Sequence, residues 1–201
     1  MNAVELAGGV VARQNFETHR INAISVWHPG SFPLFVLNES LIPERQRFVL
    51  AHELGHMVIH EGEPPRETAE READLFAEEL LMPAVEIRPQ LDSIDLRKVA
   101  ALKPFCKVPM QSLVLRAEHL GLISTSRCRS LHAYMNKLGN LPIEPNPLER
   151  EEPSVMADIL SVHLDDNGFT TKELAAALGM PAEDMMSQFS RDKGRPLRLV
   201  R

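Results

Sequence analysis

The chain has 201 residues, of which 44% are hydrophobic, so it is long enough to bury a core of its own. Its formal net charge of −6 and isoelectric point of about 5.8 exclude a general polyanion binder, because no net positive field attracts phosphate. Residues 1–11 lack the pattern of a signal peptide, and no apolar run approaches the roughly 20 residues of a membrane span. We therefore expect a cytoplasmic protein without membrane contact, in which Cys106 and Cys128 are free thiols.

Turn-forming residues separate the predicted elements of the first part of the chain. A short helix interrupted by Gly8 and Gly9 is expected over 4–17, followed by strands at 21–27 and 34–37 that form a hairpin or lie side by side. A helix then begins at Pro43, because the missing N–H of proline has no partner in a first helical turn, and it runs to about His60.

The rest of the chain has mostly helical patterns. One helix is predicted over 67–81, and further helices over 92–140 with breaks near Pro104, Pro109 and Gly121. The pattern predicts an α+β fold, with a small antiparallel or mixed sheet beside the first long helix and a mostly helical C-terminal part. We expect these parts: a core over 1–90, its helical extension over 91–140, a proline-rich linker over 141–153, and a C-terminal helical hairpin with a basic tail over 154–201.

The motif H-E-x-x-H occupies residues 52–56, within the predicted 43–60 helix. His52 and His56 stand four residues apart and therefore project from the same face of a helix. Two neutral imidazoles in this arrangement can bind one Zn²⁺, and Glu53 between them can reach a water molecule on the metal as a general base. A helix that carries two histidines by coincidence is the alternative interpretation, and further ligands would decide against it.

A catalytic zinc ion normally takes a third protein ligand and leaves its fourth position to water. His60 continues the spacing, but eight residues of helix separate it from His52 by about 12 Å along the axis, too far to share one ion. On the next helix Glu70 falls at the border of an apolar stripe, where a buried carboxylate needs a partner. We therefore predict Glu70 as the third ligand, with Glu67 in reserve, and Asp74 as the acceptor for the free N–H of a ligating histidine. The other acids of this helix are predicted on its flanks or its solvent side: Glu72, Glu78 and Glu79.

Two separated segments resemble the ImmA/IrrE family of metallo-endopeptidases. They are RQRFVLAHELGH at 45–56 and EREADLFAEELLMP at 70–83, where the family shows H-E-x-x-H followed by E-x-x-A-[N/D]-x-F-A-x-x-L-L-M-P. The resemblance is dense over 21–83 and weaker over 105–140, and it is specific because both motifs occur in the right order. Position 74 is Asp where Asn is common, and either residue can accept a hydrogen bond from a histidine.

The resemblance implies a zincin-like fold, one zinc ion on His52, His56 and Glu70, and Glu53 as the general base. It also implies an endopeptidase that cleaves a helix-turn-helix repressor or antitoxin and so relieves repression of a phage, mobile-element or stress operon. We expect that target to be a separate protein, because no repressor-like domain precedes the peptidase segment. A second donor to the oxyanion is expected from the helical region, where the candidates are His119, His132 and Tyr134.

Two alternatives to a peptidase stay open. The first is a catalytically silent zincin-like module that binds a repressor or antitoxin partner. The second is a DNA-binding regulator using residues 170–189, where Gly179 stands at the turn of a helix-turn-helix-like pattern. Its second helix would begin with Glu183 and Asp184, which repel phosphate, so the sequence favours a packed hairpin over direct nucleic-acid binding.

Overall fold

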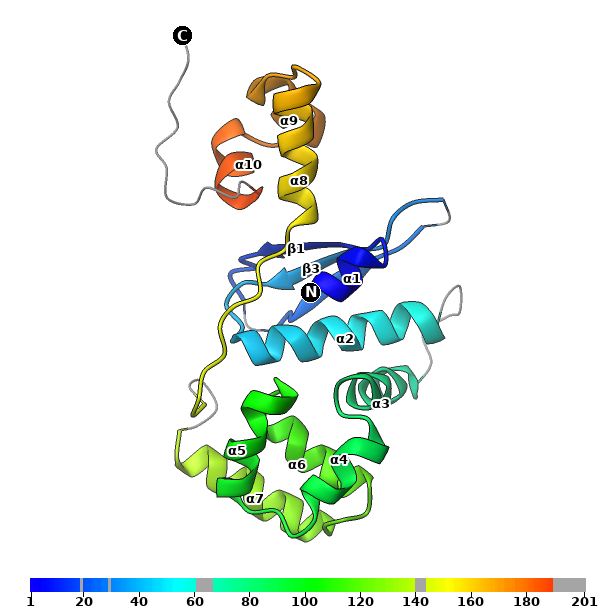
Figure 1. Cartoon of the computed structure of the whole chain (residues 1–201), viewed down its shortest axis with the longest axis vertical. Coiled ribbons are helices and arrows are strands. Elements are labelled where there is room, and N and C mark those ends of the chain that lie inside the picture. Colours follow the sequence, from blue (N-terminus) through cyan, green and yellow to red (C-terminus); the bar gives the residue numbers. More distant parts are fainter. Residues whose placement is uncertain (19, 29, 61–66, 140–143, 190–201) are drawn as a thin grey trace. The chain divides into compact units, whose positions relative to one another are not determined.

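Three short strands are followed by a succession of helices in the computed structural model (Figure 1). The structure describes residues 1–18, 20–28, 30–60, 67–139 and 144–189. The elements are, in chain order, α1 (Asn2–Leu6), β1 (Val10–Gln14), β2 (Ala23–Val26), β3 (Leu34–Asn38), α2 (Pro43–Ile59), α3 (Ala69–Leu81), α4 (Ala84–Leu91), α5 (Leu96–Cys106), α6 (Met110–His119), α7 (Thr125–Lys137), α8 (Val155–Ser161), the π-helical turn η1 (Val162–Asp166), α9 (Thr171–Leu178) and α10 (Ala182–Phe189). The fold is therefore α+β, as the sequence predicts.

Some predicted segments lie outside the described residues. They are the basic tail from 190 onwards, most of the loop expected between 61 and 67, and the first part of the linker expected over 141–153. Within the described ranges, no helix combines the length and the apolar character that a membrane crossing requires.

The strands form one sheet in the order β1-β3-β2. The two predicted strands at 21–27 and 34–37 are therefore neighbours, as expected, and β2 lies at an edge. At the end of β3, Asn38 is fully buried, and its side-chain amide donates hydrogen bonds of 2.8 Å to the carbonyls of Thr18 and Ile21. Gln46 of α2 donates to the Asn38 carbonyl over 3.2 Å. These bonds connect the chain before β2, the end of β3 and the first turns of α2.

The helix predicted over 4–17 is wrong beyond its first residues, because α1 ends at Leu6 and residues 10–14 form strand β1. Two glycines separate these elements. Gly8 has a φ of +94°, and a Cβ on Gly9 would lie only 2.8 Å from the Val4 side chain. Only glycine fits such a turn, and β-branched residues such as Val10 favour the strand that follows.

The described residues divide into two compact units. One contains those of Met1–Gln14, Val26–Val36 and Glu152–Arg201, and the other those of Asn15–Ser25 and Leu37–Glu151. In the first unit, the buried carboxylate of Glu5 accepts the backbone N–H groups of Ser154 and Val155 at the start of α8, each over 3.0 Å. The helices α8 to α10 share a small apolar cluster whose buried members are Leu160, Leu174, Ala175 and Met185.

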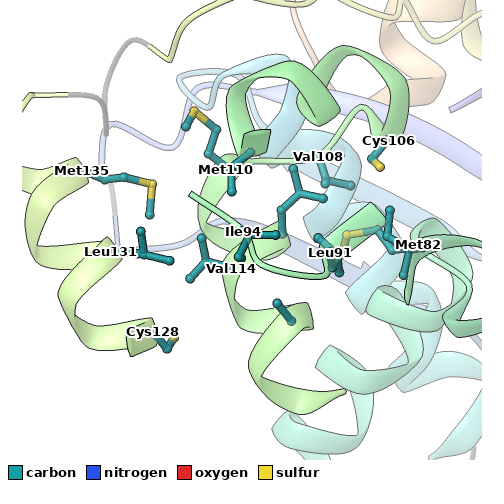
Figure 2. Packing of buried hydrophobic residues seen from close by; sticks show 14 residues of the cluster. Met82, Leu91, Ile94, Cys106, Val108, Met110, Val114, Cys128, Leu131 and Met135 are labelled. Carbon is teal, nitrogen blue, oxygen red and sulfur yellow. The ribbon is translucent and has the colours of Figure 1, made fainter. Parts of the chain in front are cut away.

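The second unit has the larger apolar core, formed by the end of α3 and by α4 to α7 (Figure 2). Helix α6 packs against α4, α5 and α7. Figure 2 shows Val114 of α6 facing Leu131 and Met135 of α7, with Met82 and Leu91 on the opposite side of the cluster. Helix α4 is not predicted from the sequence. It follows directly on Pro83 and contributes Leu91 to this core.

Helix α5 runs through Pro104, where the sequence predicts a break. A proline inside a helix leaves the carbonyl four residues earlier without its N–H partner. Here that carbonyl belongs to Ala100, and the side-chain amide of Asn146 donates to it over 3.3 Å. A segment distant in sequence therefore satisfies the group that Pro104 leaves free.

Residues 144–151, inside the predicted linker, are attached to the second unit by ionic contacts. The fully buried ammonium of Lys103 lies 2.5 Å from Glu44 and 3.4 Å from Glu144, and it donates to the carbonyls of Pro145 and Asn146. Burial raises the pKa of Glu144, although the Met110 N–H and the Lys103 charge oppose this effect. The segment is thus an extended strap that packs against α2, α5 and α6.

Candidate metal centre

The H-E-x-x-H motif lies on the last turns of α2, as predicted. Pro43 occupies the first turn of this helix. At the other end, the backbone N–H of His60 donates a hydrogen bond to the carbonyl of His56 over 2.9 Å. The imidazoles of His52 and His56 project from one face, and their Nε2 atoms lie 3.0 Å apart. Both side chains are mostly covered, with 17% and 24% of their surfaces exposed. The helix therefore directs two nitrogen donors at one point.

Glu70, on the first turn of α3, supplies an oxygen at the same point. Its Oε2 lies 3.4 Å from His52 Nε2, and its Oε1 lies 3.4 Å from His56 Nε2. Two donors that each lie about 2.05 Å from a tetrahedral ion are about 3.3 Å apart, so the spacing of the three groups fits one ion. Among the histidines, cysteines and acids of the described residues, His52, His56 and Glu70 form the group whose donor atoms could share a metal ion.

The structure brings Glu70 to the histidines, but the prediction that its carboxylate lies at the border of a buried stripe is wrong. Its side chain is 79% exposed, and Asp74 one turn later is 52% exposed. The face of α3 that the structure buries carries Ala73, Ala77 and Glu78. Leu80 of the same helix is half exposed. The donor group therefore opens towards solvent, where a water molecule or a substrate can enter.

Gly55 lets α3 come close enough to α2 to deliver Glu70. A Cβ at this position would lie 3.1 Å from Ala73 Cα, 3.1 Å from the Phe76 ring and 3.2 Å from the Ala73 carbonyl oxygen. Glycine in a helix is unfavourable relative to alanine, so its position within the motif has a packing reason. The two helices share the most extensive contact of this unit, and they lie next to each other in Figure 1.

Asp74 has the position predicted for it, with Oδ1 2.8 Å from His52 Nδ1. Burial alone would lower the pKa of His52, but the hydrogen bond and charge of Asp74, together with two nearby glutamates, raise it above its ordinary value. A partner at Nδ1 holds the ring so that Nε2 points at the donor group.

Glu53 faces a partner that the sequence does not predict. The hydroxyl of Ser25, on strand β2, donates to Glu53 Oε2 over 2.5 Å. The two residues lie 28 positions apart. The only signal in the sequence is that Ser25 belongs to a strand expected beside the motif helix. The edge strand and the motif helix therefore meet at this carboxylate.

The three candidates for an oxyanion donor have different surroundings. His119 at the end of α6 contacts the carboxylate of Glu78 through Nδ1, at 3.0 and 2.9 Å. On α7, His132 has a buried Nε2 without a hydrogen bond in the described part of the chain, and Tyr134 is 55% exposed. Of these three, His119 alone has a carboxylate that holds its ring among the described residues.

Glu78 itself is only 2% exposed, so its predicted solvent position is wrong. Helix α6 covers this side of α3, and Arg116 and His119 provide the countercharge and the hydrogen bonds. Burial raises the pKa of Glu78 in spite of these two partners. The acid is therefore part of a buried ionic cluster between α3 and α6.

A motif helix with two converging histidines, a glutamate from the next helix and a small sheet alongside defines the class of zincin-like metallopeptidase domains. The profile of the Peptidase_M78 family, described as the IrrE N-terminal-like domain, matches residues 4–118, which is more than half of the chain. The chain therefore belongs to this family, and the resemblance found in the sequence is confirmed. A search of curated proteins gave no match.

Proposed function

We propose that the chain is a zinc-dependent endopeptidase that cleaves a specific helix-turn-helix repressor or antitoxin protein. The observation that carries this proposal is the convergence of His52, His56 and Glu70, at 3.0 to 3.4 Å, beside a glutamate of the H-E-x-x-H motif. Two nitrogens and one carboxylate oxygen are one of the ligand sets of catalytic zinc, and a fourth position stays open for chemistry. The family supports a metallopeptidase, and the repressor substrate is our inference from the resemblance.

Zn²⁺ bound by these three side chains would supply a Lewis acid that polarises a peptide carbonyl and makes water acidic near neutral pH. Glu53 then acts as the general base, taking a proton from water and passing it to the leaving amine. Because the Ser25 hydroxyl already occupies Oε2, we assign the proton transfer to Oε1. Ser25 thereby fixes the rotation of the carboxylate.

Among the three candidates for oxyanion stabilisation, we favour His119. Its Nδ1 faces the buried Glu78, which leaves Nε2 as the nitrogen directed away from that carboxylate. A histidine held in one orientation stabilises developing charge better than a freely rotating side chain, because no reorganisation is needed. His132 and Tyr134 have no such contact among the described residues.

The alternative of a DNA-binding regulator has less support from the contacts. Thr170 and Glu173 form a capping box at the start of α9, and Gly179 ends this helix in the left-handed conformation. The first turn of α10 carries Glu183 and Asp184, which repel phosphate. Met185 on the same helix is buried in the cluster of α8 to α10. These features suit a packed hairpin.

The test compares the wild type with Glu53→Gln, each co-expressed with the repressor encoded beside its gene. Glu53→Gln keeps all three proposed ligands, so it should bind one zinc ion per chain and leave the repressor intact, whereas the wild type cuts it. Glu86→Gln, a change at an exposed acid of α4, is the matched control and should cut normally. Equal cutting by Glu53→Gln and the wild type would disprove the proposal. A wild type that binds zinc and the repressor without cutting would favour the silent module instead.

A further inference from the structure

His60 does not reach the donor group of the candidate metal centre, yet it contacts one of its members. Its Nδ1 lies 3.1 Å from the Nδ1 of His56. Its other ring nitrogen, Nε2, lies 2.8 Å from Oε2 of Glu72, on the first turn of α3. Thr68 donates to the second oxygen of Glu72 over 2.8 Å. The side chain of His60 is 10% exposed and that of Glu72 is 35% exposed, so the imidazole at the centre of these contacts is largely shielded from water.

With a metal ion bound by His52 and His56, the contacts permit one arrangement of protons. His56 directs Nε2 at the donor group, so its proton must be on Nδ1, because a neutral imidazole carries a single N–H. That N–H faces His60 Nδ1, which must therefore be the acceptor. The proton of His60 is then on Nε2, where it donates to the carboxylate of Glu72. With the opposite tautomer of His60, two N–H groups would face each other over 3.1 Å.

We propose that His60 and Glu72 are positioning residues that set the tautomer and the ring orientation of His56 for metal binding. The inference rests on the proposed function, because it assumes that His56 is a ligand. Each ligating histidine of α2 is then oriented by a carboxylate of α3. Asp74 contacts His52 directly, and Glu72 reaches His56 through His60.

Geometry explains why His60 lies between His56 and the carboxylate of Glu72. His52 and Asp74 lie within direct hydrogen-bonding distance at 2.8 Å. His60 stands one turn after His56, at the C-terminal cap of α2, so its ring lies against that of His56 with centroids 5.2 Å apart. The His60 imidazole bridges Glu72 and His56. Because Glu72 accepts the Nε2–H of His60, the Nδ1 of His60 is left to accept a hydrogen bond from His56.

Two variants of His60 separate its hydrogen bond from its bulk. His60→Leu removes the acceptor for His56, and His60→Asn keeps an oxygen near the position of Nδ1. Loss of a partner of this kind typically weakens metal binding ten- to a hundredfold. We expect such a loss of zinc affinity in His60→Leu, measured by competition with a chromophoric chelator, and recovery of most of it in His60→Asn. Glu72→Gln should show an intermediate loss, because an amide satisfies either tautomer of His60. His28→Leu, at an exposed histidine, is the matched control and should bind zinc like the wild type.

Nuclear magnetic resonance of the wild type tests the proposal without any substitution. Long-range ¹H–¹⁵N correlations of the histidine rings in the zinc-loaded protein should show Nδ1–H for His56 and Nε2–H for His60. An Nδ1–H tautomer of His60, or zinc affinity that is unchanged in His60→Leu, would overturn the inference while leaving the proposed function intact. A wild type that does not bind zinc would overturn both.

Discussion

The close approach of α2 and α3 at Gly55 predicts the effect of a single methyl group. In Gly55→Ala, the new Cβ would lie 3.1 Å from Ala73 Cα and from the Phe76 ring. Ordinary contacts of a Cβ begin at 3.4 Å, so α3 must move away by about 0.3 Å, the difference between the two distances. The Cα and the carbonyl oxygen of Ala73 belong to the backbone and cannot rotate aside. The helix that carries Glu70 therefore moves as a whole.

Two opposing terms determine the stability of Gly55→Ala. Alanine is favoured over glycine in a helix by about 1 kcal/mol. Overpacking of a tight contact costs about 1–3 kcal/mol. The free energy of unfolding of the metal-free protein should therefore be lowered by about 0–2 kcal/mol. Zinc affinity has no compensating gain, because the movement of α3 carries Glu70 away from the two histidines, and we expect a loss of about tenfold, similar to that from a missing ligand partner.

Urea unfolding in the presence of a chelator and zinc competition measure these two effects separately. Ala101→Gly, at an exposed position of α5, measures the helix-propensity term alone. Gly55→Ser should lose more than Gly55→Ala in both assays, because its side chain is larger. If Gly55→Ala were about 1 kcal/mol more stable than the wild type and bound zinc equally well, the tight contact would have no consequence and the reasoning would be refuted.

Three further predictions follow from contacts of the same unit. Asp74→Leu should weaken zinc binding ten- to a hundredfold in a competition assay, whereas Asp74→Asn, which still offers an acceptor, should change it little. Lys103→Met should lower the free energy of unfolding by about 3–5 kcal/mol in urea, because Glu44 and Glu144 remain buried without their cation. Burial and the charge of a neighbouring glutamate raise the pKa of Cys128 from 9.0 to about 12. The contribution of this folded thiol is complete below pH 9 and is lost as the pH rises towards 12, so the stability of the wild type relative to Cys128→Ala should fall between pH 9 and 11.

Each of these predictions has a result that contradicts it. Equal zinc affinity of Asp74→Leu and Asp74→Asn would show that the acceptor at this position does not matter. A Lys103→Met variant as stable as the wild type would mean that the two glutamates do not depend on the buried ammonium. A stability difference between the wild type and Cys128→Ala that stays constant up to pH 11 would place the thiol in a solvent-like environment.

The sequence predicts well how the two histidines of the motif are placed, because their positions obey local rules. The spacing of His52 and His56 defines a helix face without reference to the rest of the fold. Pro43 indicates where α2 begins, and the structure has it in the first turn. The boundaries of α3 are also close to the predicted ones, since Pro83 cannot continue a helix. Periodicity and proline chemistry are sufficient for these features.

The features that the sequence does not predict depend on contacts between distant segments. Pro104 predicts a break in α5, but the amide of Asn146 satisfies the carbonyl that this proline leaves free. The periodicity of α3 does not show that α6 covers Glu78. Ser25 has no local pattern that links it to Glu53, because the contact depends on how β2 lies beside α2. A helical wheel gives the direction of a side chain but not the neighbour that it meets.

The acids of α3 repel one another along one side of the helix, and this repulsion bears on the role of Glu70. Glu70, Asp74 and Glu78 are spaced four residues apart, and like charges at this spacing destabilise a helix. The charge of Asp74 indeed contributes to the raised pKa of Glu78. Repulsion within this series opposes the attraction of Glu70 to the N-terminal end of α3, so Glu70→Gln should change the free energy of unfolding of the metal-free protein in urea by less than about 1 kcal/mol. Zinc affinity should fall by more than the hundredfold typical of a lost partner. If Glu70 mainly stabilised the fold, its replacement would lower both the free energy of unfolding and the zinc affinity. A loss of stability well above about 1 kcal/mol together with the loss of zinc affinity would thus argue against Glu70 as a ligand.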